Sequence, residues 1–382
     1  MNGFLLTVIG ARRPGRIGCT LLLVAIGVAV LSPASGARRP ESSFRSAVEG
    51  YRYEFPRDHG AHDSFRTEWW YYTGHLRAGA RRFGYEQTFF RLGIPGVARS
   101  ASAWRTNQIL FRHLALTDEQ GRRFLTDEKA ERQALDLAAA DPERYRVWIG
   151  DDLAGLEADG RTHRLVGHAD DFALDLRLVP EKPPVVHGQG GVSQKSAGLG
   201  NASHYYSFTR LATTGRLVLG RDTLAVEGRS WMDHEFSSDG LKGTHTGWDW
   251  FSVQLDDGTD LMLYQLRLKD GSIEPYSSGT FVEADGRSRH LVRDAFAIQS
   301  TRTWVSPHTQ GRYPSGWVLR LPGESLELTL EPTLADQELN VRSMGGIAYW
   351  EGAVRVTGTR AGRAVTGMGY VELTGYAGRT PF

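Results

Sequence analysis

Polar and apolar residues alternate with a period of two over many short segments of this chain, and Gly, Pro, Asn or Asp separates the segments. We expect β-strands over residues 107–116, 172–179, 216–219, 317–321 and 326–330. Hairpin turns are expected at 256–258, 270–271, 285–286 and 361–362, where glycine tolerates a positive φ. Short strands at regular spacing predict an all-β fold, a sandwich or barrel, rather than a doubly wound sheet.

Only residues 126–140 have a helical pattern. This segment has acidic residues in its first turn and a body rich in alanine and leucine, and Pro142 follows its end. We therefore expect one small helix there.

The chain divides into two halves that each begin with a tryptophan-rich strand. The first such strand is Glu-Trp-Trp-Tyr-Tyr at 68–72, and the second is Trp-Asp-Trp-Phe at 248–251. We expect each half to form its own antiparallel barrel, the first over 51–245 and the second over 246–382.

The N-terminus has the pattern of a signal peptide. Three arginines precede an apolar run at 20–31, and small residues follow it up to Ala37. The pattern predicts a signal peptide over 1–37, cleavage near Ala37 and a periplasmic or secreted protein. The alternative is an uncleaved membrane anchor, for which the run is short. Cleavage would remove three basic residues and the single cysteine, leaving a net charge of −2 and no possible disulfide.

Charge and cysteine content exclude several classes of function. The full chain has 45 Lys and Arg against 44 Asp and Glu, so no basic excess favours a nucleic-acid partner. A single Cys excludes both a disulfide scaffold and a thiolate zinc site. No cofactor is indicated.

The first candidate site is the strand at 68–72, where Glu68, Trp70 and Tyr72 share one face. A carboxylate between aromatic rings can bind a ligand, or it can have a raised pKa in an apolar pocket. The alternative is that Glu68 forms a buried ion pair with an arginine. The neighbouring segment supplies a second carboxylate, Glu86, and a possible partner, Arg91.

The second candidate is the strand at 228–236, where Trp231, Asp233 and Glu235 share one face and His234 lies on the other. Inside a barrel, desolvation would raise the carboxyl pKa and keep a neutral acid available near pH 7. The alternative is an ion pair with an arginine, or a strand end at the barrel rim.

No metal centre is expected. The His-Glu pair at 234–235 begins a zinc-protease pattern, but Ser238 stands where the second histidine belongs. His59 and His62 lie in an N-terminal loop and form no complete ligand set.

The glycine-rich segment at 188–196 superficially resembles a phosphate loop. Gln194 replaces the glycine before Lys195, and no helix is predicted after it. We interpret the segment as a loop over a barrel mouth, which would bring several side chains to a ligand from above. These are His187, Lys195, Asn201, His204 and Tyr205. The sequence has no Gly-x-Ser-x-Gly motif, which disfavours an ordinary serine hydrolase.

An ordered set of short motifs resembles the carotenoid 1,2-hydratase/AttH-like lipocalin-like family. The motifs extend over nearly all of the chain that follows the predicted signal peptide. They are Glu-Trp-Trp-Tyr-Tyr at 68–72, Lys-Pro-Pro-Val-Val-His-Gly at 182–188, Gly-Asn-Ala-Ser-His-Tyr-Tyr-Ser at 200–207, Trp-Met-Asp-His-Glu-Phe-Ser at 231–237, Gly-Trp-Asp-Trp-Phe at 247–251, Tyr-Trp-Glu-Gly at 349–352 and Gly-Tyr-Val-Glu-Leu-Thr-Gly at 369–375.

The resemblance implies two lipocalin-like antiparallel β-barrel domains in tandem. It also implies relatives that hydrate isoprenoid double bonds, and others that bind or cyclise apolar molecules. The pigment-pathway members have Tyr-x-Asp near the later aromatic strand, whereas Tyr264-Gln-Leu266 lacks that acid here. Carotenoid specificity is therefore not expected.

Together, the residues and the resemblance lead us to expect an exported protein that binds an apolar, isoprenoid or lipid-like molecule and hydrates an alkene, which would make it a hydro-lyase. Asp233 would be the acid, His234 or Glu235 would assist, and tryptophan faces would stabilise a carbocation. The expected ligand-binding residues are Glu68, Trp70, Tyr72, Glu86, His187, His204, Tyr205, Trp231, Trp248, Trp250 and Tyr264.

Two alternatives remain open at this point. One is a non-catalytic periplasmic carrier of a hydrophobic molecule, linked to a membrane transport system. The other is a secreted hydrolase or glycan-binding protein, which would need two carboxylates on opposite walls and exposed tryptophans.

Overall fold

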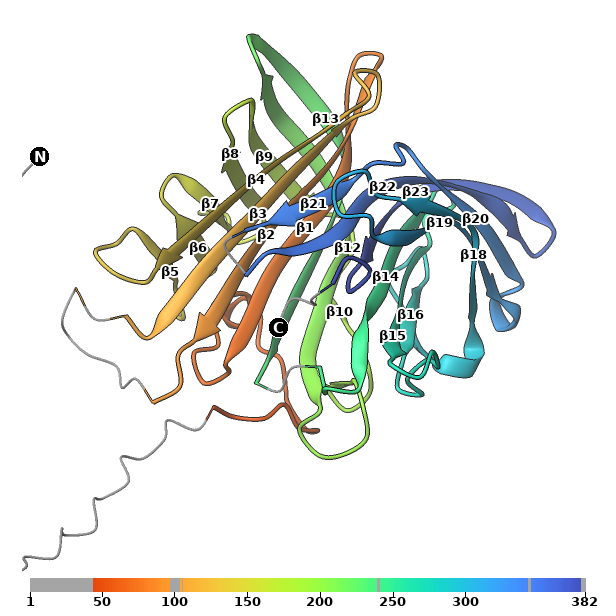
Figure 1. Ribbon diagram of the computed structural model, residues 1–382. Helices are drawn as coiled ribbons and strands as arrows, with labels where there is room; N and C mark the ends of the chain where they lie inside the picture. Colours follow the sequence, from red (N-terminus) through yellow and green to blue (C-terminus); the bar gives the residue numbers. More distant parts are fainter. Residues whose placement is uncertain (1–43, 97–103, 105, 239–240, 343–344, 379–382) are drawn as a thin grey trace, which may run out of the picture. The chain divides into compact units, whose positions relative to one another are not determined.

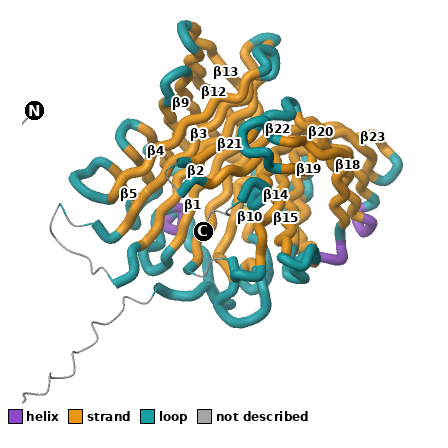
Figure 2. Tube along the Cα trace, in the orientation of Figure 1, coloured by secondary structure: helices purple, strands orange, loops and turns teal. Residues whose placement is uncertain are grey.

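The computed structural model describes residues 44–96, 104, 106–238, 241–342 and 345–378. The predicted signal peptide at 1–37 lies outside this part of the chain. The described residues form strands and loops, with three short 3₁₀ turns at Arg57–His59, Arg293–Ala295 and Pro322–Glu324 (Figure 2). Within these ranges, no helix has the length and apolar character needed to cross a membrane.

The first sheet contains thirteen antiparallel strands and curls almost into a closed barrel (Figure 1). Its main path runs β4-β3-β2-β1-β13-β12-β9-β8-β7-β6-β5, and β10 and β11 pair with β12. The strands are β1 (Thr67–Ala78), β2 (Arg81–Gly93), β3 (Gln108–Asp118), β4 (Arg123–Arg132), β5 (Ala138–Ala140), β6 (Arg146–Ile149), β7 (Asp152–Leu156), β8 (His163–His168), β9 (Phe172–Pro180), β10 (Val185–Val186), β11 (Ser193–Gln194), β12 (Ala202–Leu219) and β13 (Asp222–Ser237).

The second sheet has ten antiparallel strands and forms a half-barrel (Figure 1). Its path runs β17-β16-β15-β14-β23-β22-β20-β19-β18, and β21 pairs with β22. The strands are β14 (His245–Leu255), β15 (Asp260–Leu268), β16 (Ser278–Val282), β17 (Ser288–Val292), β18 (Ala297–Val305), β19 (Arg312–Leu321), β20 (Leu326–Pro332), β21 (Glu338–Val341), β22 (Ile347–Arg360) and β23 (Arg363–Leu373). The expected all-β fold with two tandem lipocalin-like domains is confirmed.

The predicted strands and hairpin turns are present. For example, β3, β9, β19 and β20 cover the expected segments. Gly258 and Gly271 have φ of 88° and 86°, which a residue with a Cβ rarely adopts, so glycine permits these tight reversals.

The prediction of a helix at 126–140 is wrong. Residues up to Arg132 belong to β4, which pairs along its whole length with β3, and β5 begins at Ala138. Leu135 and Asp136 between them have positive φ values of 56° and 59°, which end any regular structure. The preceding strand β3 offers a full row of backbone partners across a short hairpin turn, and this cross-strand pairing outweighs the helix propensity of the segment.

Because both sheets are curved, each has an inner face, toward the interior of its barrel or half-barrel, and an outer face. The two sheets contact each other through their outer faces. Trp70 and Tyr72 lie in the core of the first sheet, and Phe251 and Val253 lie in the core of the second. A third cluster combines outer-face residues of both sheets, including Tyr71 and Trp250. The candidate site lies in this third layer.

Close backbone approach and polar bonds join the two outer faces. A Cβ built on Gly84 of β2 would lie only 2.5 Å from the Cβ of Ala353 on β22, so glycine allows this contact. Lys182 donates to Asp260 at 2.7 Å, and Arg210 donates to the same carboxylate at 2.6 Å.

Candidate active site

A pocket of about 140 Å³ lies between the outer faces of the two sheets. Strands β1, β2, β12 and β13 form one side of it together with the segment that follows β11, and β14, β15, β22 and β23 form the other. Eight aromatic residues contribute to its lining. The aromatic residues are Trp69, Tyr71, Phe90, Tyr205, Trp248, Trp250, Tyr264 and Tyr349.

Asp233 on β13 projects into this pocket and is only 4% exposed. Its carboxylate accepts hydrogen bonds from the Tyr205 hydroxyl at 2.8 Å, from the Trp231 indole at 2.6 Å and from the Ser207 hydroxyl. Burial raises the pKa of Asp233 to about 7, although these three hydrogen bonds lower it. Both protonation states are therefore populated near neutral pH.

Tyr205 connects Asp233 to the second sheet. Its hydroxyl donates to Asp233 and accepts a hydrogen bond from the Trp250 indole at 3.1 Å. When Asp233 is protonated, its own O–H can donate to Tyr205 in place of the bond it accepts. The tyrosine hydroxyl can thus donate to the ionised carboxylate and accept from the protonated carboxyl group.

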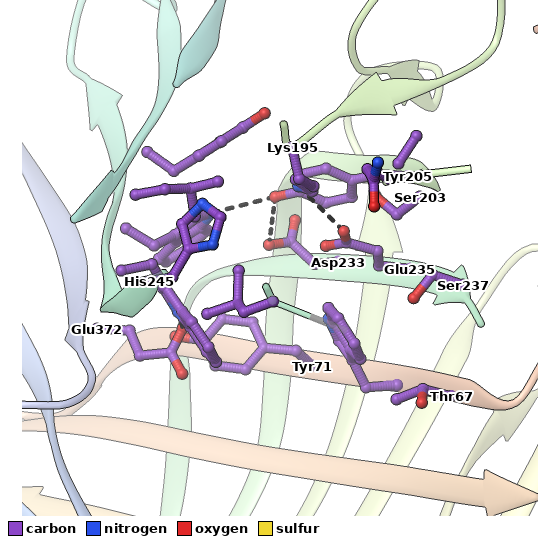
Figure 3. Close-up of a pocket in the computed structure, with 18 of the residues that line it drawn as sticks. Thr67, Tyr71, Lys195, Ser203, Tyr205, Asp233, Glu235, Ser237, His245 and Glu372 are labelled. Atoms are coloured by element: carbon purple, nitrogen blue, oxygen red, sulfur yellow. Dashed lines mark hydrogen bonds and ion pairs between the residues drawn. The ribbon is translucent and has the colours of Figure 1, made fainter. Parts of the chain in front are cut away.

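Glu235 lies next to Asp233 on the same face of β13 and pairs with Lys195. The Lys195 ammonium lies 3.1 Å from a carboxylate oxygen of Glu235. It also lies 4.2 Å from the ring centroid of Tyr264 and 5.2 Å from that of Tyr205. Figure 3 shows Lys195, Tyr205, Asp233 and Glu235 together on one side of the pocket. The alternative that the sequence left open for this strand, an ion pair, is therefore present at Glu235, with a lysine in place of the arginine.

Glu372 on β23 is the carboxyl group on the other side, next to Tyr71 in Figure 3. One of its oxygens accepts a hydrogen bond from the Trp248 indole at 2.7 Å. Burial raises the pKa of Glu372 to about 8, and the charges of Asp233 and Glu235 raise it as well. Glu372 therefore holds a proton at neutral pH.

Two further carboxyl groups lie close to Glu372 outside the pocket lining. Glu351 on β22 is directly opposite Glu372 in the strand register, and the Tyr71 hydroxyl donates to it at 2.5 Å. Glu86 on β2 accepts a hydrogen bond from Thr88, and burial raises its pKa to about 8. Glu86 was predicted to contact the ligand, but the structure places it behind the pocket wall.

His234 points away from the pocket, into the first sheet. Its Nε2 donates to Glu68 at 2.8 Å, and the Tyr206 hydroxyl donates to its Nδ1 at 2.9 Å. Glu68 also accepts hydrogen bonds from Arg91 at 2.8 Å and from His62 Nδ1 at 2.7 Å. The ion pair between Glu68 and an arginine that the sequence left open is therefore present. From this position His234 cannot reach a ligand beside Asp233.

His62, Glu68 and His234 place one potential metal-ligating atom each within 4.8 Å of one another. The residues fit a hydrogen-bonded cluster better than a metal centre. The contacts from Glu68 to both histidines have hydrogen-bond lengths, and Arg91 places a fixed positive charge against the same carboxylate. A cation there would have to displace these donors.

The remaining predicted residues divide between the pocket and its surroundings. Tyr205, Trp248, Trp250 and Tyr264 line the pocket with Asp233 and Glu235. Trp70 and Tyr72 belong to the inner core, and the indole of Trp231 supports Asp233 without lining the pocket.

The two predicted histidines of the 187–204 region make structural bonds. His187 is hydrogen bonded to Thr280 at 2.7 Å and Ser207 at 2.6 Å, and His204 to the Gly191 carbonyl at 2.8 Å. From the glycine-rich segment, Lys195 and Ser196 line the pocket between the sheets, to which Asn201 also contributes, whereas Val192 packs in a separate cluster with Phe65 and Phe236.

Sequence reasoning selected one face of β1 and missed the face that lines the pocket. Alternation indicated that Trp69 and Tyr71 lie opposite Glu68 and Trp70, and the pocket uses Trp69 and Tyr71. Glu372 was missed because it occurs singly in an ordinary strand. Its position opposite another glutamate, Glu351, was the signal that could have identified it.

The comparisons with known proteins agree with the motif resemblance. The model of the AttH-like family matches residues 46–376. The crystal structure of an AttH protein from Nitrosomonas europaea is 37% identical, has a TM-score of 0.78, and the match covers 87% of this chain and 99% of that one. Among proteins with curated descriptions, none matches.

Two more distant crystal structures share the fold. Kievitone hydratase from Nectria haematococca is 14% identical with a TM-score of 0.67, and the match covers 87% of this chain and 97% of that one. CghA is 15% identical with a TM-score of 0.51, over 82% of this chain and 90% of that one.

Proposed function

Since this chain belongs to the AttH-like family, we propose that its pocket binds an apolar, alkene-bearing molecule, isoprenoid or lipid-like, and adds water across the double bond by acid catalysis. The observation that carries this proposal is Asp233, a carboxyl group with a pKa of about 7 inside an aromatic pocket. An acid of that strength can give up a proton and recover it near neutral pH. The fold shared with kievitone hydratase is consistent with hydration chemistry.

The reaction needs one proton transfer in each direction. The O–H bond of Asp233 breaks as the π electrons of the alkene take its proton and form a C–H bond, which leaves a carbocation. A water molecule then forms the C–O bond, and the proton it loses returns to the Asp233 carboxylate. The sum is alkene plus water to alcohol, and the carboxyl group is regenerated.

The pocket supplies what the intermediate needs. The ring faces of Trp250 and Trp248 stabilise positive charge through their quadrupoles, by about 0.5–2 kcal/mol each. Glu235 lines the pocket beside Asp233 and can orient the water. His234 takes no part in this scheme because it lies on the other face of β13.

The cavity volume sets the size of the enclosed group. A cavity of about 150 Å³ accepts a benzene molecule, and this pocket measures about 140 Å³. One branched five-carbon unit fits inside, so the remainder of a longer ligand would extend out of the pocket.

A non-catalytic carrier is the second candidate, and the three hydrogen bonds to Asp233 favour it. Donors from Tyr205, Ser207 and Trp231 stabilise the ionised form, which is what a structural carboxylate requires. In this case the same ligand would bind without turnover, in a protein exported to the periplasm and linked to a transport system.

Incubation with a panel of short terpenoid alkenes in isotope-labelled water distinguishes the two functions. We expect labelled oxygen in an alcohol product, and a rate at least about 100-fold lower for Asp233→Asn. The matched control is Asp249→Asn, which removes a buried carboxyl group outside the pocket lining. Turnover near the wild-type rate in Asp233→Asn contradicts the role of Asp233. Binding of the panel with no product in any variant identifies a carrier.

A further inference from the structure

We propose that this pocket binds a compact organic cation, of the size of a trimethylammonium group, between its aromatic ring faces and the carboxylate of Glu372. The inference rests on the proposed function, because the carbocation of the hydration reaction would be a transient occupant of the same place. It goes beyond the proposed function, whose ligand is apolar, by assigning the pocket a permanently charged occupant.

An internal cation already uses this aromatic surface. The Lys195 ammonium lies over the ring of Tyr264 at 4.2 Å and within 5.2 Å of the Tyr205 centroid, with Glu235 at 3.1 Å. Ring faces combined with a carboxylate are the environment that recognises alkylammonium groups. The Glu235 side of the pocket is thus filled by the protein's own side chain.

The opposite side has the same composition but no cation. Glu372, Trp248, Tyr71 and Trp69 line it. Within the described part of the chain, the Glu372 carboxyl group accepts its hydrogen bond from the indole N–H of Trp248. Among the described residues, no basic side chain forms an ion pair with Glu372. Its exposed surface faces the pocket, so a ligand can reach it.

The charge balance of the pocket favours a cation once Glu372 is ionised. The lining contains the carboxyl groups of Asp233, Glu235 and Glu372 and the ammonium groups of Lys195 and Lys242. Lys195 is paired with Glu235, and Lys242 is exposed and donates to the Ala197 carbonyl at 2.7 Å. When Asp233, Glu235 and Glu372 are all ionised, the lining has one more negative than positive charge, and an organic cation beside Glu372 balances it.

Ligand charge and the protonation of Glu372 are linked. Several titratable groups surround it or line the same pocket: Asp233 and Glu235 on β13, Glu351 on β22, Glu86 on β2, Tyr71 on β1, Tyr349 on β22, Tyr370 on β23, His245 on β14, and Lys195 and Lys242. The pKa of Glu372 is about 8, so a bound cation must drive a proton off at neutral pH. Affinity for a cation should then increase as pH rises through about 8, with release of a proton.

Calorimetric titration with two probes tests the inference. One probe is choline, and the other is the neutral alcohol in which a tert-butyl group replaces the trimethylammonium group. The two probes have the same shape and differ in charge. We expect choline to bind at least about tenfold tighter at about pH 9. Its affinity should fall toward about pH 6, while that of the neutral probe stays constant. Titration in two buffers of different ionisation enthalpy measures the released proton.

Two variants change the result in opposite directions, so that a folding defect cannot imitate both. Glu372→Gln removes the counter-charge and should weaken choline binding about tenfold without changing the neutral probe. Lys195→Met removes the internal cation and should tighten choline binding. The control is Glu331→Gln, a half-exposed carboxylate on β20 outside the pocket, which should change neither.

Equal affinity for the two probes, absence of choline binding, or a pH-independent choline affinity overturns the inference. Unchanged choline binding in Glu372→Gln also overturns it. These failures leave the proposed function intact if the alkene panel is hydrated. Conversely, selective choline binding without any alkene turnover supports the cation site and contradicts the hydratase.

Discussion

Glu351 and Glu372 lie directly opposite each other on the antiparallel strands β22 and β23. Like charges at such positions repel, and burial adds a large desolvation cost. The pKa of Glu351 is raised well above its ordinary value by burial first and then by the charges of Glu372 and Glu86. The layer between the sheets therefore retains protons at neutral pH on carboxyl groups that would ionise in water.

The first prediction is that stability declines with rising pH because of this pair. The folded-state pKa of Glu351 lies above its unfolded value of about 4.5. Its contribution to the free energy of unfolding is therefore complete below about pH 4.5 and is lost as pH rises through the folded-state pKa. For a carboxyl group with a folded-state pKa of about 8, as at Glu372, the free energy of unfolding falls by about 1.4 kcal/mol per pH unit between about pH 5 and 8. Glu351→Gln should flatten this slope in urea titrations, whereas Glu331→Gln should not. An unchanged slope would mean that Glu351 is ionised in the folded protein.

The second prediction concerns the ion cluster inside the first sheet. Glu68→Gln leaves the fully buried Arg91 without its counter-charge, which should cost about 3–5 kcal/mol. The pKa of Glu68 lies well below its usual range, with Arg91 and His62 as the lowering charges, so the wild-type protein should also lose stability in acid. Urea unfolding of Glu68→Gln and of Glu331→Gln measures the difference. A loss below about 1 kcal/mol would show that the cluster is exposed to water.

The third prediction separates the hydrogen bonds that hold Asp233. Tyr205→Phe removes a donor that stabilises the carboxylate, so the pKa of Asp233 should rise above its value of about 7. Infrared titration of the protonated carboxyl band, assigned with Asp233→Asn, records this pKa. Tyr313→Phe removes a comparable hydroxyl bond, to Glu338, in the second sheet and should leave the band unchanged. A lower pKa in Tyr205→Phe would show that burial of Asp233 depends on the tyrosine.

The fourth prediction tests the contact between the two sheets. Gly84→Val places a side chain against Ala353, where even a Cβ would lie 2.5 Å away, and should destabilise the protein by about 1–3 kcal/mol. Ala353→Gly in the same chain should recover part of the loss, which a double-mutant cycle measures. Gly323→Ala, where the added methyl group meets nothing within 4 Å, is the control. Additive effects of the two substitutions would argue against a direct contact.

The fifth prediction concerns export. If residues 1–37 are a cleaved signal peptide, the protein recovered from the periplasm or medium should begin at Arg38. Intact-mass measurement of the secreted and membrane fractions determines this. A full-length chain in the membrane fraction would instead identify an uncleaved anchor.

Several features follow from sequence because they depend on local order. The period-two pattern determines that Asp233 and Glu235 share one face of a strand and that His234 lies on the other, and the structure has this arrangement. The two tryptophan-rich segments became β1 and β14, and the ordered motifs indicated the family. The segment at 126–140 was mispredicted because its composition favours a helix, whereas its residues up to Arg132 pair with the preceding strand β3 in a hairpin.

The tertiary structure alone decided where the site lies. Alternation along a strand tells which residues share a face, but not whether that face meets solvent, a barrel core or a second sheet. The outer faces of the two sheets cover each other, so Trp69, Tyr71 and Glu372 line the pocket, while Glu68, Trp70 and Tyr72 lie in a core. This contact between the sheets removes water from Asp233 and Glu372 and raises their pKa values. The effect cannot be predicted from one strand alone, because it depends on two surfaces that are distant in sequence.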